Sequence, residues 1–406
     1  MKDYLLENKY ELITTFFIFT NLFPQWFPQW MYYVSFVLIL YKMRQYSPLG
    51  KTGKTGLFMA FIVFLWITTT IGNALDLRLV IFSAILFVGM PRGSIEWHEY
   101  KKKLLFNIFI GFGVATLANF YAKLNGINLI REDEYMRAMG RVAEFSGFAN
   151  YAMWTSCAAA LSAVFFTSMA FREEIENKWL RYGCYTMILV SLYITMISAS
   201  RAAFFLSLAC SALVIKMHSK GMSHLIRNVM IVGVTVVGFT PILMDNAKAM
   251  LHKKNGLEIT TKNTSRDALW AERIAEFESS PIIGIGFAAH GVGKNKIVGR
   301  NESGGSFISV LAQAGIIGII FIALIWAAAI MLPARIGDDP NLILIYAGFV
   351  FFSIHCIIEG YMFQAGWYLC LIIWLIIGVM IEHKYYGSVI IASEESDSYY
   401  IDSEKD

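Results

Sequence analysis

The sequence has few charged residues, few prolines and few cysteines for its length. Of its 406 residues only 16% are charged, and it holds 8 prolines and 5 cysteines. Because a soluble globular domain has about a quarter of its residues charged, this composition excludes an ordinary soluble protein. The net charge of +4 is small, and it predicts no nucleic-acid partner.

The cysteines show neither paired spacing nor the spacing of a metal site, so the sequence predicts no disulfide framework and no bound metal. All lie in apolar segments, as expected of small buried residues: Cys157, Cys184, Cys210, Cys356 and Cys370. The first ten residues are polar, and no small-residue cleavage site follows the first apolar run. We therefore expect that run to remain as a helix rather than to be removed as a signal peptide.

Apolar runs are what the sequence has in excess. Hydrophobic residues make up 57% of the chain, and many fall in runs of about 17 to 22 residues, the length that crosses a bilayer. We predict an all-α integral membrane protein with about twelve transmembrane helices. The expected spans are 11–23, 29–41, 56–73, 77–90, 104–122, 148–170, 180–198, 202–216, 226–243, 307–331, 342–359 and 363–381.

Lysine and arginine gather in alternate loops, after the second, fourth, sixth, eighth and tenth expected spans. They are Lys42, Arg44, Lys51, Lys54, Arg92, Lys101, Lys102, Lys103, Arg172, Lys178, Arg181, Lys216, Lys220, Arg227 and Arg335. By the positive-inside rule these loops and both termini are cytoplasmic. The remaining loops then face the periplasm or the cell exterior.

One long polar stretch interrupts the apolar runs, from about Asn246 to Gly305, on the non-cytoplasmic side. It divides the chain into membrane helices (1–245), a large outer loop with short helices (246–306), further membrane helices (307–381) and an acidic, serine-rich tail (382–406). We expect the tail to be disordered because it has too few apolar residues to fold alone. We expect the chemistry in the outer loop.

Arg201 stands at the outer junction of the seventh and eighth expected spans, between Ser200 and Ala202. An arginine beside hydrocarbon is costly, so such a residue usually faces a cavity or a partner. Its small neighbours leave room for a ligand. The alternative is an arginine whose stem lies along the membrane while its charged head reaches water.

Residues 264–277 predict a helix that opens with a Thr-x-x-Asp capping box. Arg266, Trp270 and Arg273 follow at i, i+4 and i+7, so they share one face. Two guanidinium groups at this spacing suit a pyrophosphate, and Trp270 suits a sugar. The alternative is an amphipathic helix whose arginines contact lipid headgroups.

The glycine-rich stretch 284–293 predicts a turn at which the backbone approaches something closely. Within it, His290 is a candidate general base or else a hydrogen-bonded loop histidine. Glu302, just before the tenth expected span, is the first candidate for a base that takes the proton of a sugar hydroxyl; otherwise it is an acid placed at a helix N-terminus. Glu359 and His355, four apart at the end of the eleventh span, either line a cavity or pair with each other.

Together these segments resemble the O-antigen polymerase and O-antigen ligase superfamily of bacterial membrane glycosyltransferases. The resemblance consists of a Ser-Arg-small motif, a large-loop pattern, the start of the following helix and an Arg…Gly…Asn segment. The matching residues are 200–203, 266–270 with 280–286, 314–318, and Arg141 with the segment 145–150 that ends in Asn150.

The sequence departs from the ligases at one place. Ligases carry a His-Asn pair just before the helix that follows the large loop, and here Gly304-Gly305 stands there, with Glu302 two residues upstream of it. A Glu-Ser-Gly-rich sequence at this position is more similar to the polymerase branch, which we therefore favour.

The resemblance implies a GT-C-like helical fold and an inverting, metal-independent glycosyl transfer at the periplasmic face of a bacterial inner membrane, without a cofactor. It also implies an undecaprenyl-pyrophosphate-linked oligosaccharide as donor, with membrane lipid, a glycan acceptor and a chain-length regulator as further partners. The implied roles are pyrophosphate binding for Arg201, Arg266 and Arg273; catalysis for Glu302, His290, Arg201 and Arg273; and sugar or acceptor binding for Trp270, Arg141, Asn150 and Glu359.

Other functions stay open. One is ligase transfer of glycan to lipid A-core, and another is transport of a lipid-linked oligosaccharide without reaction. A transporter tends to have structural repeats and broken helices in corresponding halves, whereas this sequence has one asymmetric outer loop and few charges within its spans. A membrane scaffold without chemistry is the remaining alternative.

Overall fold

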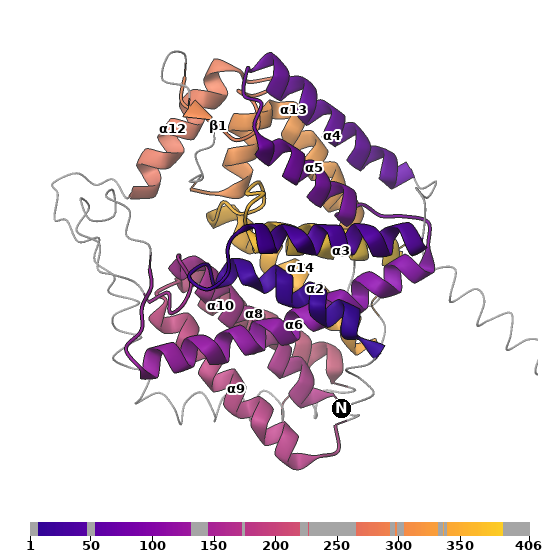
Figure 1. Ribbon diagram of the computed structural model, residues 1–406, viewed down its shortest axis with the longest axis vertical. Helices are drawn as coiled ribbons and strands as arrows, with labels where there is room; N and C mark the ends of the chain where they lie inside the picture. The colour runs from indigo at the N-terminus through magenta and orange to yellow at the C-terminus, as the bar shows by residue number, and fades with distance from the viewer. Residues whose placement is uncertain are drawn as a thin grey trace, which may run out of the picture.

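The computed structural model describes residues 7–46, 53–130, 145–172, 175–219, 226, 265–292, 297–298, 304–331, 336 and 339–384. These residues form an all-α protein, and the strands within that part of the chain are one short antiparallel pair (Figure 1). The all-α class expected from the apolar runs is confirmed.

The helices before the polar stretch are α2 (Lys9–Phe19), the short 3-10 helix η1 (Thr20–Leu22), α3 (Trp30–Tyr46), α4 (Gly53–Ile71), α5 (Leu77–Gly89), α6 (Ile95–Leu124), α8 (Ala152–Phe171), α9 (Lys178–Ile197) and α10 (Arg201–His218). After it come α12 (Ser265–Ser279), β1 (Ala289–His290), β2 (Ile297–Val298), α13 (Ser306–Ala329), α14 (Pro340–Ile358) and a last helix over residues 368–384. The helices before the polar stretch pack both on their neighbours in the chain, as α8 on α9, and on distant helices, as α10 on α8 and α14. Apart from α12, each α-helix lies at an expected span; the expected span 226–243 lies outside the described residues.

Seven of the described helices are long and apolar enough to cross a membrane. They are α4, α6, α8, α9, α10, α13 and α14, while α5 is apolar but shorter. Their outward positions are also apolar, as on α4, where Val63, Ile67 and Ile71 are exposed. Because a bilayer accepts such a surface and water does not, the chain is a multi-pass membrane protein. The count of about twelve crossings stays a prediction.

Connections gather at two ends of the bundle. We call one the α12 end: it holds the connections 20–29, 72–76, 145–151, 198–200 and 359–367. A hydrogen bond from Asn21 Nδ2 to Gly366 O (3.1 Å) ties two of these connections together, and one from Ser306 Oγ to Glu359 O (2.6 Å) ties the start of α13 to the same end.

The opposite end collects the cations. Lys102 pairs there with Asp339 (2.6 Å), and Thr55 Oγ1 donates to Pro91 O (2.6 Å). The helix ends and connections at this end carry, among the described residues, Lys42, Arg44, Lys54, Arg92, Lys101, Lys102, Lys103, Arg172, Lys178, Arg181 and Lys216. The loops rich in lysine and arginine therefore lie together at one end of the bundle. α12 lies at the other end, which is poor in these cations (Figure 1).

Exposed tryptophan and tyrosine side chains lie at both ends of the bundle. Trp26, Trp30 and Tyr121 are exposed at the α12 end, and Tyr41 and Trp179 at the opposite end. Aromatic residues with a polar atom are enriched at the two water–lipid boundaries of membrane proteins, so these residues fit the membrane assignment.

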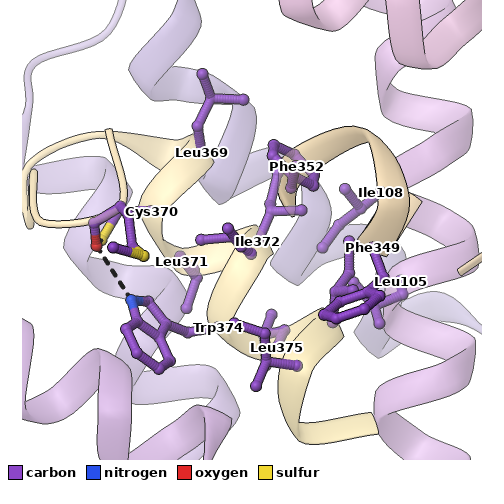
Figure 2. Packing of buried hydrophobic residues seen from close by; sticks show 14 of the residues in the cluster. Leu105, Ile108, Phe349, Phe352, Leu369, Cys370, Leu371, Ile372, Trp374 and Leu375 are labelled. Carbon is purple, nitrogen blue, oxygen red and sulfur yellow. Dashed lines mark hydrogen bonds between the residues drawn. The ribbon is translucent and has the colours of Figure 1, made fainter. Parts of the chain in front are cut away.

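The last helix (368–384) runs through the centre of the bundle, and nearly all of its side chains are buried. Figure 2 shows part of this cluster, in which the last helix packs with Leu105 and Ile108 of α6 and with Phe349 and Phe352 of α14; its labelled residues are Leu369, Cys370, Leu371, Ile372, Trp374 and Leu375. Trp374 Nε1 donates to Met362 O at 3.1 Å, so the indole N–H is satisfied. A helix that is apolar on all sides is expected to lie inside such a core.

The polar end of the last helix belongs to the bundle. Glu382 is 1% exposed and accepts from Lys101 Nζ (2.9 Å) and from the backbone N–H of Arg92 (2.8 Å). The tail was expected to begin at residue 382, which is too early. A carboxylate looks like a tail residue in the sequence, but here a buried cation partner keeps it in the core.

α13 is broken at Gly315, where φ is 63° and ψ is −164°. The preceding glycine-rich segment, 281–289, lies in the break and uses the backbone groups that it frees. Two of its amides, at Ile285 and Gly286, donate to the carbonyls of residues 312 and 313 (3.0 Å each). In return, the amides of residues 316 and 317 donate to the carbonyls of residues 281 and 282 (2.9 and 3.2 Å).

Two glycines allow this interlocking contact. A Cβ at Gly284 would lie 2.2 Å from the Gln313 carbonyl carbon, and one at Gly315 would lie 2.3 Å from Ile282 O. Within a membrane protein a helix break is tolerated where neighbouring chain satisfies the freed groups. The close approach predicted for the glycine-rich stretch is therefore an approach to α13, within the protein itself.

Candidate functional site

Arg201 begins α10 at the α12 end of the bundle. The turn before it is tight, since α9 ends at Ile197 and Ala199 takes a positive φ of 55°, a conformation that costs a non-glycine residue about 1–2 kcal/mol. Ser200 caps α10 by accepting from Ala203 N at 3.4 Å. The guanidinium thus stands at a helix N-terminus, where the positive end of the helix dipole also favours anions.

The charge of Arg201 is open to a ligand. Its side chain is exposed, and no carboxylate within the described ranges forms an ion pair with it. This is the arrangement expected of an arginine that binds an anion at the edge of the membrane.

Three neighbouring helix ends bring predicted residues into one region. α8, α10 and α14 pack on one another, and α8 and α10 begin at the α12 end while α14 ends there. Asn150 lies just before α8, Arg201 begins α10 and Glu359 caps the C-terminus of α14. Two helix N-termini, one arginine and one carboxylate therefore share this part of the molecule.

Hydrogen bonds hold the chain around Glu359. Ser306 Oγ donates to Glu359 O (2.6 Å) and accepts from Met362 N (3.2 Å). Burial raises the pKa of Tyr361 well above its ordinary value, so the phenol keeps its proton, and its oxygen forms a hydrogen bond with His355 Nδ1 at 3.1 Å. These contacts fix the connection that follows α14, while a pairing of Glu359 with His355 stays a prediction.

A second polar cluster is buried beneath α12. Arg273, 1% exposed, places Nη2 2.5 Å from Glu276 Oε1 and in contact with His290 Nδ1. Glu276 is fully buried, and its Oε1 also accepts from the backbone N–H of Gly291. The charge of Arg273 is therefore balanced inside the protein by a carboxylate on the next turn of the same helix.

The burial of Arg273 corrects the prediction that Arg266, Trp270 and Arg273 offer one exposed face to a pyrophosphate. Helical spacing shows which residues share a face, but it does not show which face is turned inward. Here Trp270 is 39% exposed while Arg273 is buried against β1, so the two do not present one open surface to a ligand. A pyrophosphate role for Arg273 stays a prediction, and it would require this cluster to open.

His290 lies on the accepting side of this cluster. Because its Nδ1 accepts from Arg273, the proton of the neutral imidazole is assigned to Nε2. His290 is also buried, at 1% exposed. This geometry favours the hydrogen-bonded loop histidine over the general base, since the accepting nitrogen is already engaged.

The same cluster has the composition of a metal site. Ligand atoms of Glu272, Glu276 and His290 lie within 4.8 Å of one another. However, Arg273 Nη2 contacts both Glu276 and His290, so a guanidinium occupies the position that a cation would take. The residues therefore fit an internal ion pair better than a metal.

Packing against Trp270 explains Gly304. Trp270 Nε1 donates to Gly304 O at 2.9 Å, and a Cβ at Gly304 would lie 2.9 Å from Trp270 Cδ1. Gly304 also has a positive φ of 64°, and a Cβ at Gly305 would lie 2.8 Å from Ile357 O. A side chain at either position would therefore require its neighbours to move.

The structure does not describe the side chains of three of the predicted site residues. Glu302 and Arg141 lie outside the described residues, and Arg266 lies in α12 at a position where the structure does not describe the side chain. Their predicted roles stay predictions.

The sequence did not point to the residues that hold Arg273 and the segment 281–289 in place. Glu276 had a local signal, because it follows Arg273 at i+3, a spacing at which side chains meet on a helix. Thr69 and Gln313, which accept from the amides of Phe287 (3.1 Å) and Ala288 (3.0 Å), had none. Their partners are distant in the sequence, so only the fold reveals them.

Comparison of the chain with protein-family models gives no match, and comparison with curated protein sequences gives none either.

Proposed function

We propose that this chain is a membrane glycosyltransferase of the O-antigen polymerase type, acting at the α12 end of the bundle. Its donor would be an undecaprenyl-pyrophosphate-linked oligosaccharide and its acceptor a glycan hydroxyl. The cations at the opposite end support a cytoplasmic location for that end. The α12 end would then face the periplasm of a bacterial inner membrane, in a GT-C-like fold of about twelve crossings.

The observation that carries the proposal is the open charge of Arg201. It stands at the N-terminus of α10, beside the N-terminus of α8, and it has no carboxylate partner among the described residues. A pyrophosphate is a dispersed anion that suits a guanidinium and helix N-termini together. Arg201 therefore becomes the leading residue for donor binding, ahead of the internally paired Arg273.

In the proposed reaction an acceptor hydroxyl oxygen attacks the anomeric carbon of the donor sugar. The bond from that carbon to the pyrophosphate oxygen breaks, the configuration inverts, and a carboxylate takes the hydroxyl proton. Arg201 would stabilise the negative charge that develops on the leaving group. Glu302 remains the first candidate for the base. Glu359, a carboxylate at the same end as Arg201, replaces His290 as the second.

The test uses cells that lack the chain and receive it back as variants. Arg201→Ala should abolish the polysaccharide ladder on a gel, and Arg201→Lys should restore part of it because lysine keeps the charge but loses the planar fork. Lys123→Ala, which removes another exposed cation at the α12 end, should leave the ladder intact. A normal ladder from Arg201→Ala in folded protein contradicts the proposal.

The same gels separate polymerase from ligase. Loss of a polymerase leaves single repeat units on lipid A-core, whereas loss of a ligase leaves the core bare. The ligase alternative gains no support from Gly304 and Gly305, because they stand where the resemblance would place a His-Asn pair.

Transport is the alternative that one observation favours, because broken helices are typical of transporters. In this chain the break at Gly315 is filled by the segment 281–289, which uses the amides of residues 316 and 317 and the carbonyls of residues 312 and 313. These groups are therefore engaged by the protein rather than offered to a substrate, and we place transport second.

A further inference from the structure

The middle turns of α12 expose apolar side chains and bury charged ones, the reverse of a helix on a water-facing surface. Among the described side chains of α12 the exposed ones are Trp270, Ala271, Ile274 and Ala275, followed at the C-terminal end of the helix by Glu278 and Ser279. Its buried positions include the charged Arg273 and Glu276. A helix at a water-facing surface turns its apolar stripe inward and its charges outward, whereas the exposed side chains of α12 between residues 270 and 275 are apolar. We call Trp270, Ala271, Ile274 and Ala275 the α12 stripe.

The α12 stripe adjoins a surface that already faces lipid. α12 packs on α13, whose outward residues Ile316, Ile320 and Leu324 follow at i, i+4 and i+8 on a candidate span. The amides of residues 316 and 317 bind the chain that leaves α12, and Ile282 in that chain is 63% exposed. Apolar surface is therefore continuous from the span to the chain that leaves α12.

A second apolar rim lies on the other side of the segment 281–289. A Cβ at Gly72 would lie 2.5 Å from Ile285 O, so the connection between α4 and α5 touches this segment. That connection and the start of α5 expose Leu75 and Leu77. Exposing Leu75 and Leu77 to water would be costly. Together with the α12 stripe, these side chains form exposed apolar surface at the α12 end of the bundle.

We propose that α12 lies in the interfacial layer of the bilayer at the α12 end, with the α12 stripe in contact with membrane lipid. Trp270 supports this depth, because tryptophan prefers the boundary between headgroups and acyl chains. The side chains of the α12 stripe are all apolar, so the stripe itself would contact the apolar part of the interface. This inference concerns membrane contact and does not depend on glycosyl transfer.

Membrane contact of the α12 stripe also bears on the buried cluster of Arg273, Glu276 and His290. With its outer face held by lipid, α12 turns Arg273 and Glu276 inward, where His290 and Gly291 receive them. Lipid contact and the internal ion pair would then fix the rotation of α12 about its axis from two sides.

The test places a spin label at Ile274, on the α12 stripe. The five native cysteines are buried, so Ile274→Cys is the accessible thiol, and unsubstituted protein gives the labelling background. In vesicles of phosphatidylethanolamine and phosphatidylglycerol, collision of the label with oxygen reports lipid, and collision with a water-soluble nickel chelate reports water. Phe205→Cys, on the outer face of the candidate span α10, serves as lipid control, and Asn125→Cys, exposed after α6, as water control.

The oxygen-to-nickel ratio at Ile274 should be several-fold higher than at Asn125 and should approach the ratio at Phe205. A ratio equal to that at Asn125 means that the stripe faces water and overturns the proposal. Low collision with both reagents means that protein covers the stripe, a second copy included, and also overturns it. If Ile274→Cys does not fold, Ala271→Cys and Ala275→Cys report on the same stripe with a smaller change in volume.

Discussion

The interlock between α13 and the segment 281–289 predicts a large effect from one methyl group. Gly315→Ala places a side chain where φ is 63° and ψ is −164°, a region that is essentially restricted to glycine. The new Cβ would also lie 2.3 Å from Ile282 O and 2.4 Å from the Ile282 carbonyl carbon. The helix break and the inserted segment cannot both keep their positions.

The magnitude follows from two costs. A backbone conformation of this kind costs a non-glycine residue about 1–3 kcal/mol. Moving the segment away lengthens the hydrogen bonds from the amides of residues 316 and 317, and two lost bonds cost about 1 kcal/mol each. The variant should therefore be destabilised by about 3–5 kcal/mol.

Thermal unfolding in detergent measures this effect, with two glycines as controls. Gly183 has open space around its Cβ position within α9, so Gly183→Ala should be at least as stable as the parent protein. Gly126 has a φ of +68° but also open space, so Gly126→Ala reports the cost of a positive φ without a steric clash. We expect Gly315→Ala to unfold at a clearly lower temperature than both. If it unfolds together with Gly126→Ala, the interlock adds nothing and the reasoning is refuted.

Three further predictions follow from other contacts. Glu276→Gln removes the carboxylate from buried Arg273 and should cost about 3–5 kcal/mol, whereas the exposed Glu278→Gln should be neutral; equal melting of the two would refute the buried cluster. Burial alone raises the pKa of Asp339, but the hydrogen bond and charge of Lys102 and the amides of Leu342 and Asn341 hold it below its ordinary value of 3.8. Its stabilisation is therefore present above that value and lost as the pH falls through the folded pKa, so the stability gap between parent and Asp339→Asn should close in acid; a constant gap contradicts this. Gly378→Ala puts a Cβ 1.8 Å from Gly89 O and should abolish monodisperse protein, while Gly56→Ala, with open space, should not; normal yield from Gly378→Ala would contradict the crossing of the last helix with α5.

Local pattern predicted most of the helices. The apolar runs placed both ends of α4, α5, α9 and α14 to within three residues, because a long apolar run in lipid has few alternatives to a helix. The alternation of lysine and arginine likewise predicted which helix ends share one end of the bundle. These features depend on neighbours in the sequence, which is why sequence alone could reach them.

Long-range pairing was beyond the sequence. The two glycine motifs around Gly284 and Gly315 looked like separate features, yet they are the two halves of one contact. The inward turn of Arg273 and the burial of Glu382 depend on His290 and Lys101, which come from other elements. Spacing along one helix carries no information about such partners.

Product analysis in vesicles tests the central claim most directly. Purified protein is reconstituted with undecaprenyl-pyrophosphate-linked oligosaccharide, with Arg201→Ala and Lys123→Ala in parallel. We predict new glycosidic bonds and longer glycans with the parent protein and with Lys123→Ala, and none with Arg201→Ala. Unaltered oligosaccharide that has moved to the other leaflet, or equal product from Arg201→Ala, would contradict the account.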